Sequence, residues 1–94
     1  MATLYVCEYA DDDINSAKEP PLAEQTVAIG GASVACSNAF HAQTRLIRVH
    51  TDAICSIAIG KAPTATAAKK RMAANTTEYF SVESGFKIAV ITNT

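Results

Sequence analysis

The segment from Thr44 to Gly60, TRLIRVHTDAICSIAIG, constrains the fold more than any other part of the chain. Its first half alternates apolar and polar residues with the period of two that is typical of a strand with one buried face. Its second half is apolar on both faces, which indicates a strand covered on both sides. A polar break at residues 51–52 separates the halves, so the segment predicts two short central strands on which the rest of the chain packs.

Further strands are predicted by alternation and by β-branched and aromatic residues. They are residues 3–9, 25–29, 77–82 and 86–91, with a short strand at 71–75 that buries Met72. Turn signals recur every 8–12 residues, among them a hairpin turn at 30–31 and a turn at 83–85. This spacing predicts an all-β fold, a small antiparallel β-sandwich or barrel that is jelly-roll-like.

Two segments between the strands have a different composition. Residues 32–43 fit either a single helical turn near 37–41 or an irregular strand, and residues 61–69 read as a long loop interrupted by Pro63. Residues 10–23 contain three consecutive aspartates and a Pro-Pro pair, which indicates a loop or an extended arm. That segment is either a solvated loop or one that orders on a partner. The whole chain, 1–94, is expected to form a single β domain.

Composition restricts the functions this chain can have. Charged residues make up only 18% of it, against about 25% in an average globular domain. A small domain with so few charges is expected to bury part of its surface against neighbours, as a homo-oligomer or an assembly component. The net charge of −1 and the scattered basic residues argue against a nucleic-acid partner.

The sequence also bears on location. No run approaches the roughly 18 apolar residues of a membrane span, and the acidic N-terminus lacks the basic region of a signal peptide, so neither a membrane partner nor secretion is expected. The three cysteines are odd in number and widely spaced, which favours free thiols in a reducing compartment over a disulfide framework.

Catalytic chemistry has one candidate location, where His50 and Asp52 flank Thr51 and Ser56 follows. No nucleophile-elbow motif surrounds Ser56, so we interpret the tripeptide as a turn in which Asp52 accepts backbone N–H bonds and Thr51 supports it.

Metal and cofactor sites are not predicted either. The potential metal ligands show none of the spacings that preorganise a site; they are Cys7, His41, Cys36, His50 and Cys55. The acidic run 11–13 lacks the glycine and distal glutamate of a calcium loop, and no phosphate-binding glycine motif is present. The sequence therefore predicts no catalytic residue, no cofactor-binding residue, no metal-binding residue and no cofactor. Tyr5, Tyr9 and Tyr79 fit either a sugar-binding platform or the rim of strands.

The run from Thr44 to Ile91 resembles a recurrent pattern in small structural proteins of tailed bacteriophages and prophages. Its landmarks are a strand, a polar break, a strand ending in Ala-Ile-Gly, a Pro-Thr-Ala loop, then Met, Ala-Asn, Glu-Tyr-Phe and a closing Lys-Ile-Ala-Val-Ile strand. The resemblance covers half of the chain, and residues 1–43 carry none.

The resemblance implies a virion component without enzymatic activity, most simply a capsid decoration (cement) protein. Such a protein is assembled in the host bacterial cytoplasm, binds the major capsid protein and is often a trimer. The alternatives are a tail, neck or fibre-base component, or a module that binds glycans or the host surface. No functional residues transfer, because the shared landmarks are structural.

Overall fold

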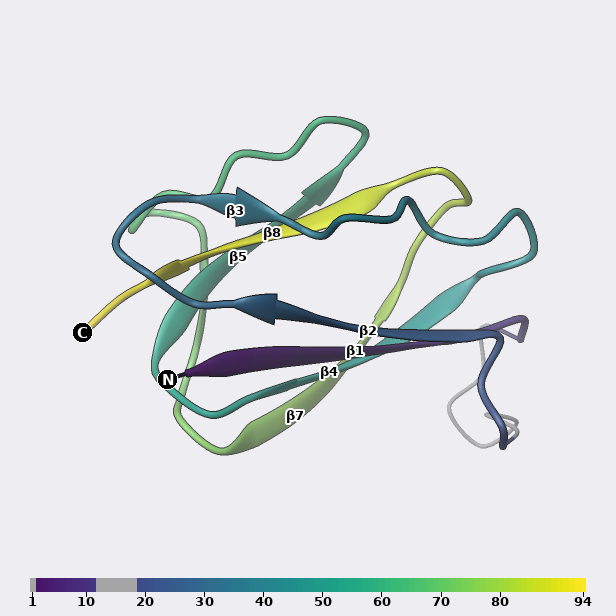
Figure 1. Cartoon of the computed structure of the whole chain (residues 1–94), viewed down its shortest axis with the longest axis horizontal. Helices are drawn as coiled ribbons and strands as arrows, with labels where there is room; N and C mark the ends of the chain where they lie inside the picture. Colours follow the sequence, from purple (N-terminus) through teal and green to yellow (C-terminus); the bar gives the residue numbers. More distant parts are fainter. Residues whose placement is uncertain (1, 12–18) are drawn as a thin grey trace.

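Two antiparallel four-stranded sheets pack face to face in the computed structural model, which describes residues 2–11 and 19–94 (Figure 1). Sheet A has the order β2 (Ala23–Ala28), β1 (Thr3–Tyr9), β4 (Leu46–Thr51) and β7 (Thr76–Ser81). Sheet B has the order β3 (Val34–Ala35), β8 (Lys87–Thr92), β5 (Cys55–Gly60) and β6 (Lys70–Met72). The predicted all-β sandwich is therefore confirmed.

The two predicted central strands exist, but they do not pair with each other. β4 is an interior strand of sheet A and β5 is an interior strand of sheet B, so the polar break carries the chain from one sheet to the other. Thr51 rather than Asp52 closes this turn, because its hydroxyl donates a 2.6 Å hydrogen bond to the Ala53 carbonyl and accepts one of 3.3 Å from the Ala53 amide.

Two predictions for the segment before β4 are corrected. The glycine pair at 30–31 lies between β2 in sheet A and β3 in sheet B, so it is a crossing between sheets and not a hairpin turn. Residues 37–41 form no helical turn. Val34 and Ala35 pair with Val90 and Ala89 of β8, and the amides of Cys36 and Phe40 donate further hydrogen bonds to the carbonyls of Ile88 and Phe86. Of the two alternatives predicted for residues 32–43, the irregular strand is closer to the structure than the helical turn.

The strand order is that of a circularly permuted jelly roll. If β2 is counted as the first strand and β1 as the eighth, sheet A has the order 1-8-3-6 and sheet B the order 2-7-4-5. This is a jelly-roll arrangement of eight strands in two sheets. The jelly-roll connection that would join β8 to β1 is replaced by the two ends of the chain, which lie at the same end of the sandwich (Figure 1).

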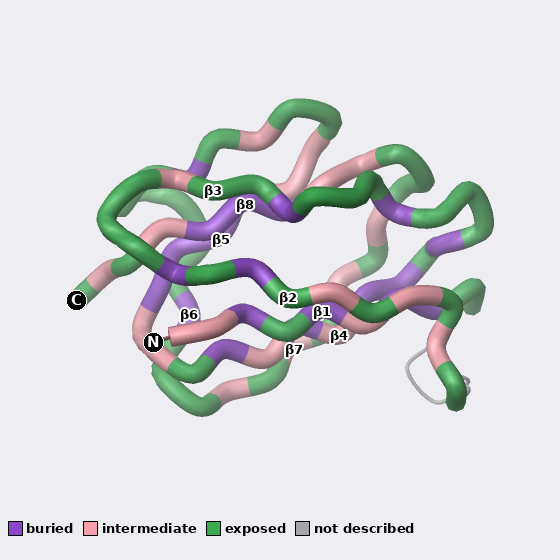
Figure 2. The backbone as a smooth tube through the Cα atoms, in the orientation of Figure 1, coloured by how far each residue is buried: buried purple, intermediate pink, exposed green. Residues whose placement is uncertain are grey.

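The core lies between the sheets, and buried residues occur along strands of both sheets (Figure 2). Met72 in β6 is fully buried, as predicted. The cluster of buried apolar residues draws on both sheets and on the crossing segments: Leu4, Val6, Val27, Ile29, Cys36, Phe40, Ile47, Val49, Cys55, Ile57, Met72, Ile88 and Val90.

The outward side of sheet B is also covered, which explains the two-faced apolar character of β5. Ser56 and Ala89 point away from the core yet are 0% exposed, and the loop 61–69 lies on this side of the sheet, where it is hydrogen-bonded to Ser33 and Asn93. Asn93 fixes the loop by donating hydrogen bonds to the Ser56 hydroxyl (2.7 Å) and the Ala67 carbonyl (3.3 Å). The small side chains on this side of the sheet give the loop room to approach.

The connection between β1 and β2 is described at its ends only. Residues 12–18 of the predicted arm lie outside the described residues. The Leu22 amide donates a 2.7 Å hydrogen bond to the Glu8 carbonyl, so the chain is already aligned with β1 one residue before β2 begins. Within the described part of the chain, no helix has the length and apolar character needed to cross a membrane.

Candidate binding surfaces

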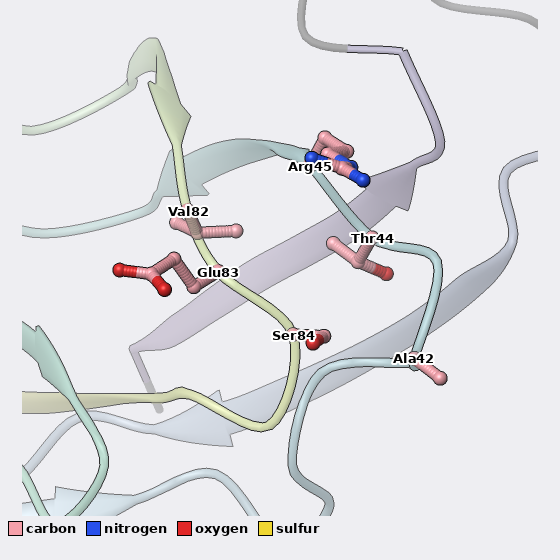
Figure 3. Close-up of a pocket in the computed structure, with 6 residues that line it drawn as sticks. All are labelled: Ala42, Thr44, Arg45, Val82, Glu83 and Ser84. Atoms are coloured by element: carbon pink, nitrogen blue, oxygen red, sulfur yellow. The ribbon is translucent and has the colours of Figure 1, made fainter.

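One hollow lined by described residues is too small for a typical ligand. It has a volume of about 150 Å³, whereas sites for small molecules occupy about 300–1,000 Å³. It lies between the segment before β4 and the segment after β7, and the side chain of Glu83 points away from it (Figure 3). Its lining is Ala42, Thr44, Arg45, Val82, Glu83 and Ser84.

The candidate catalytic residues are not brought together. His50 lies on the outward side of sheet A, with its Nε2 atom 4.0 Å from Oδ1 of Asp52 and its Nδ1 atom 2.8 Å from the Thr77 hydroxyl. Ser56 lies in sheet B, on the opposite outward side, where it is buried and accepts the hydrogen bond from Asn93. A nucleophile and a base must be within hydrogen-bond reach, and this pair faces in opposite directions.

The cysteines and histidines are dispersed as well. Cys36 and Cys55 lie in the core, and burial raises the pKa of the Cys55 thiol. Cys7 lies on the outward side of sheet A, and His41 lies in the segment before β4, where its Nδ1 atom accepts a hydrogen bond from the Gln43 amide. The described residues contain no group of three His, Cys, Asp or Glu side chains that could hold a metal ion.

The outward side of sheet A carries two of the three tyrosines in an open position. Tyr5 is 42% exposed and Tyr79 is 40% exposed. The strand register places Tyr5 beside His50, which in turn faces Thr77; in the next row Cys7 is beside Arg48, which faces Tyr79. We call this set the tyrosine face: Tyr5, Cys7, Arg48, His50, Thr77 and Tyr79.

Tyr9 points to the same side of the sheet but is not part of the tyrosine face. It is 5% exposed, and its hydroxyl donates a 2.7 Å hydrogen bond to the Glu19 carboxylate. Burial and this hydrogen bond raise the pKa of the Tyr9 hydroxyl well above its ordinary value. The sequence could group the three tyrosines by strand parity, but it could not show that the connection to β2 covers one of them.

A second surface, on the sheet B side, has no charged residue. Residues 30–35, GGASVA, and 62–68, APTATAA, are exposed over most of their length and lie together, because the Ala65 amide donates a 2.8 Å hydrogen bond to the Ser33 hydroxyl. Val34 is 42% exposed at the edge of sheet B, but it pairs with Val90 of the core and points to the inward side, so the loop side of this segment carries Ser33 and Ala35. We call residues 30–35 and 62–68 the uncharged surface. Each segment is visibly charge-free in the sequence, but only the fold shows that they are neighbours.

Comparison with known proteins provides no assignment: no protein-family model, no curated protein and no solved structure matches this chain.

Proposed function

We propose that this chain is a non-enzymatic structural protein of a bacteriophage virion, a decoration or cement protein that binds and stabilises the capsid lattice. Its partner is the major capsid protein, and copies of the chain associate on the lattice as a homo-oligomer, with a trimer favoured. Assembly takes place in the host cytoplasm, where the free thiols of all three cysteines are stable.

The uncharged surface is the observation that carries this proposal. Protein interfaces are depleted of charged residues at their centres, since a charge that loses its water without a partner is costly. Two segments distant in sequence, 30–35 and 62–68, combine into one charge-free area, joined by the hydrogen bond from the Ala65 amide to the Ser33 hydroxyl. An area of this kind suits burial against neighbouring protein on a lattice.

The sequence resemblance supports the same proposal and is independent of residues 30–35. It covers residues 44–91, which form β4 to β8 and therefore every strand of sheet B except β3. Its Pro-Thr-Ala landmark lies in the loop that covers sheet B and supplies half of the uncharged surface. Four of the landmarks therefore build the proposed attachment side, namely β5, the Pro-Thr-Ala loop, Met72 in β6 and the closing strand β8, while the first strand and Glu-Tyr-Phe belong to sheet A.

Co-sedimentation with phage capsids that lack this protein tests the proposal. We expect saturable binding by the natural protein and weaker binding by Thr66→Asp, which places a charge in the uncharged surface at an exposed loop position. Thr26→Asp is the matched control, because Thr26 is exposed on the edge strand of sheet A. Absence of capsid binding by the natural protein would contradict the decoration role and favour a tail, neck or fibre-base component.

A glycan-binding or host-surface module is the second candidate function. It is favoured by one observation, the presence of Tyr5 and Tyr79 in open positions on the same side of sheet A.

A further inference from the structure

We propose that the tyrosine face binds a neutral oligosaccharide, which lies across Tyr5 and Tyr79 and is hydrogen-bonded by Arg48, His50 and Thr77. The site goes beyond capsid attachment: it lies on sheet A, whereas the uncharged surface lies on the sheet B side. A decoration protein attached through the uncharged surface would present the tyrosine face away from the lattice.

The spacing of the two rings fits a chain of several sugars. Tyr5 is on β1 and Tyr79 on β7, with β4 between them, and the register offsets them by two residues along the strands. Strands are about 4.8 Å apart and rise about 3.4 Å per residue, so the two Cα atoms are about 12 Å apart on the diagonal. One sugar ring cannot cover both tyrosines, but a short oligosaccharide can.

The side chains between the rings supply the polar half of such a site. A pyranose has apolar C–H faces that pack on an aromatic ring and hydroxyl groups around its edge that need hydrogen-bond partners. Arg48 lies directly beside Tyr79, and His50 lies directly beside Tyr5. The His50 and Tyr5 rings have centroids 6.1 Å apart and planes tilted by 48°, which supports the Tyr5 ring from one side. The tyrosine face thus alternates aromatic rings, on which the C–H faces of sugars can pack, with groups that can hydrogen-bond the sugar hydroxyls.

Charge balance on this side of the sheet favours a neutral ligand. Arg48 lies in one row with Cys7 and Glu24, so its positive charge is matched by the Glu24 carboxylate two strands away. Burial and the nearby Glu24 raise the pKa of the Cys7 thiol, which keeps the centre of the row uncharged at neutral pH. Asp52 similarly lies 4.0 Å from His50. A polyanion such as a nucleic acid would meet no excess of positive charge here.

The small area of the outward side of sheet A also favours a sugar over a protein as its ligand. Four strands of six residues have a flat outline of about 400 Å², which is small for a partner that contributes about 800 Å² of accessible surface to a standard protein interface. One end of this area is closed by the contact between Tyr9 and Glu19. The remaining area is suited to a short oligosaccharide, and a second copy of the chain is the competing occupant that the experiment must distinguish.

The test is a titration of the ¹⁵N-labelled full chain with neutral hexasaccharides of glucose (α- and β-linked), mannose, xylose and N-acetylglucosamine at millimolar concentrations, followed by two-dimensional NMR. We expect saturable shifts of β1, β4 and β7 amides with at least one sugar, and at least tenfold weaker binding by Tyr5→Ala and by Tyr79→Ala. Val34→Ala is the matched control, since Val34 is as exposed as Tyr5 but lies in sheet B. It should bind as the natural protein does.

Three results would overturn the sugar site. They are the absence of shifts with every sugar, shifts that map outside the tyrosine face, and a concentration-dependent dimer that Tyr5→Ala abolishes, which would assign the face to a second copy. Capsid co-sedimentation is a separate measurement, and both tyrosine variants should retain capsid binding. Failure of the sugar site and failure of the decoration role are therefore distinguishable.

Discussion

The Thr44 hydroxyl donates a 2.7 Å hydrogen bond to Oε1 of Glu8, and each of these side chains is only 1% exposed. The backbone amide of His41 donates a second 2.7 Å hydrogen bond to the same oxygen. Glu8 lies near the end of β1, on the inward side with Leu4 and Val6. Its carboxylate therefore ties the long crossing segment between β3 and β4 to sheet A.

Replacing Glu8 with leucine should destabilise the protein by about 2–4 kcal/mol, because it leaves a buried amide and a buried hydroxyl without an acceptor. The matched variant is Glu8→Gln, whose side-chain carbonyl can still accept from His41 and Thr44, and it should cost less than half as much. Urea denaturation of both variants measures the difference. Equal stability of Glu8→Leu and the natural protein would show that this carboxylate is not a structural anchor.

Ala89 gives a prediction about the loop that covers sheet B. It points outward from β8 and is 0% exposed, while Ala35, its partner on β3, is exposed. Ala89→Leu should push the loop 61–69 away and destabilise the protein by about 1–3 kcal/mol, because a filled site has no room for three more carbons. Ala35→Leu should change stability by less than about 0.5 kcal/mol. Thermal unfolding compares the two, and similar melting temperatures would contradict the close packing of the loop.

Because of Tyr9, we expect the free energy of unfolding to fall at alkaline pH. Burial and the hydrogen bond to Glu19 raise the pKa of its hydroxyl above the ordinary value of 10.0, so the folded protein holds this proton more tightly than the unfolded chain. The resulting stabilisation is fully present below pH 10 and is lost as the pH rises further, because the unfolded chain ionises first. The fall can reach about 1.4 kcal/mol per pH unit.

Urea denaturation between neutral pH and pH 11 checks this dependence. Tyr9→Phe should be about 1 kcal/mol less stable at neutral pH through the lost hydrogen bond, and its stability should fall less steeply above pH 10. Tyr79→Phe, which leaves Tyr9 intact, should keep the steep fall. Parallel curves for the natural protein and Tyr9→Phe would refute the role assigned to Tyr9.

Local patterns predicted most of the strands, because alternation records which side of a strand is buried. The segments 44–60 and 86–91 were located in this way, and Met72 was correctly placed in the core. Alternation does not record the partner of a strand. For that reason β4 and β5 were predicted as two central strands without any sign that they belong to different sheets, and the glycine pair at 30–31 was interpreted as a hairpin.

The two binding surfaces could be predicted even less well than the sheets, because each depends on which segments the fold places side by side. Parity in the sequence places Tyr5 and Cys7 on one side of their strand, and Arg48 and His50 on one side of theirs, but only the register brings these pairs into adjacent rows. The burial of Glu8 could not be predicted from the sequence either. A carboxylate next to Tyr9 is typical of a solvated strand end, and only the structure shows that His41 and Thr44, from a distant segment, donate hydrogen bonds to it.

The permuted jelly-roll order predicts that the chain can be opened elsewhere. Both terminal segments are hydrogen-bonded to the same place in the chain. The Ile29 amide donates a hydrogen bond to the Ala2 carbonyl, and the Thr92 amide donates one to the carbonyl of the next residue, Gly30. A linker of six Gly and Ser residues has a root-mean-square span of about 13 Å, enough to join the two ends of the chain.

A permutant with joined ends, opened in the connection between β1 and β2, should fold to the same sandwich with β1 as its last strand. A second permutant opened between Arg48 and Val49 should not fold, because β4 is an interior strand whose inward residues are in the core. Circular dichroism and thermal unfolding compare them. An unfolded first permutant, or a folded second one, would show that the strand order described here is wrong.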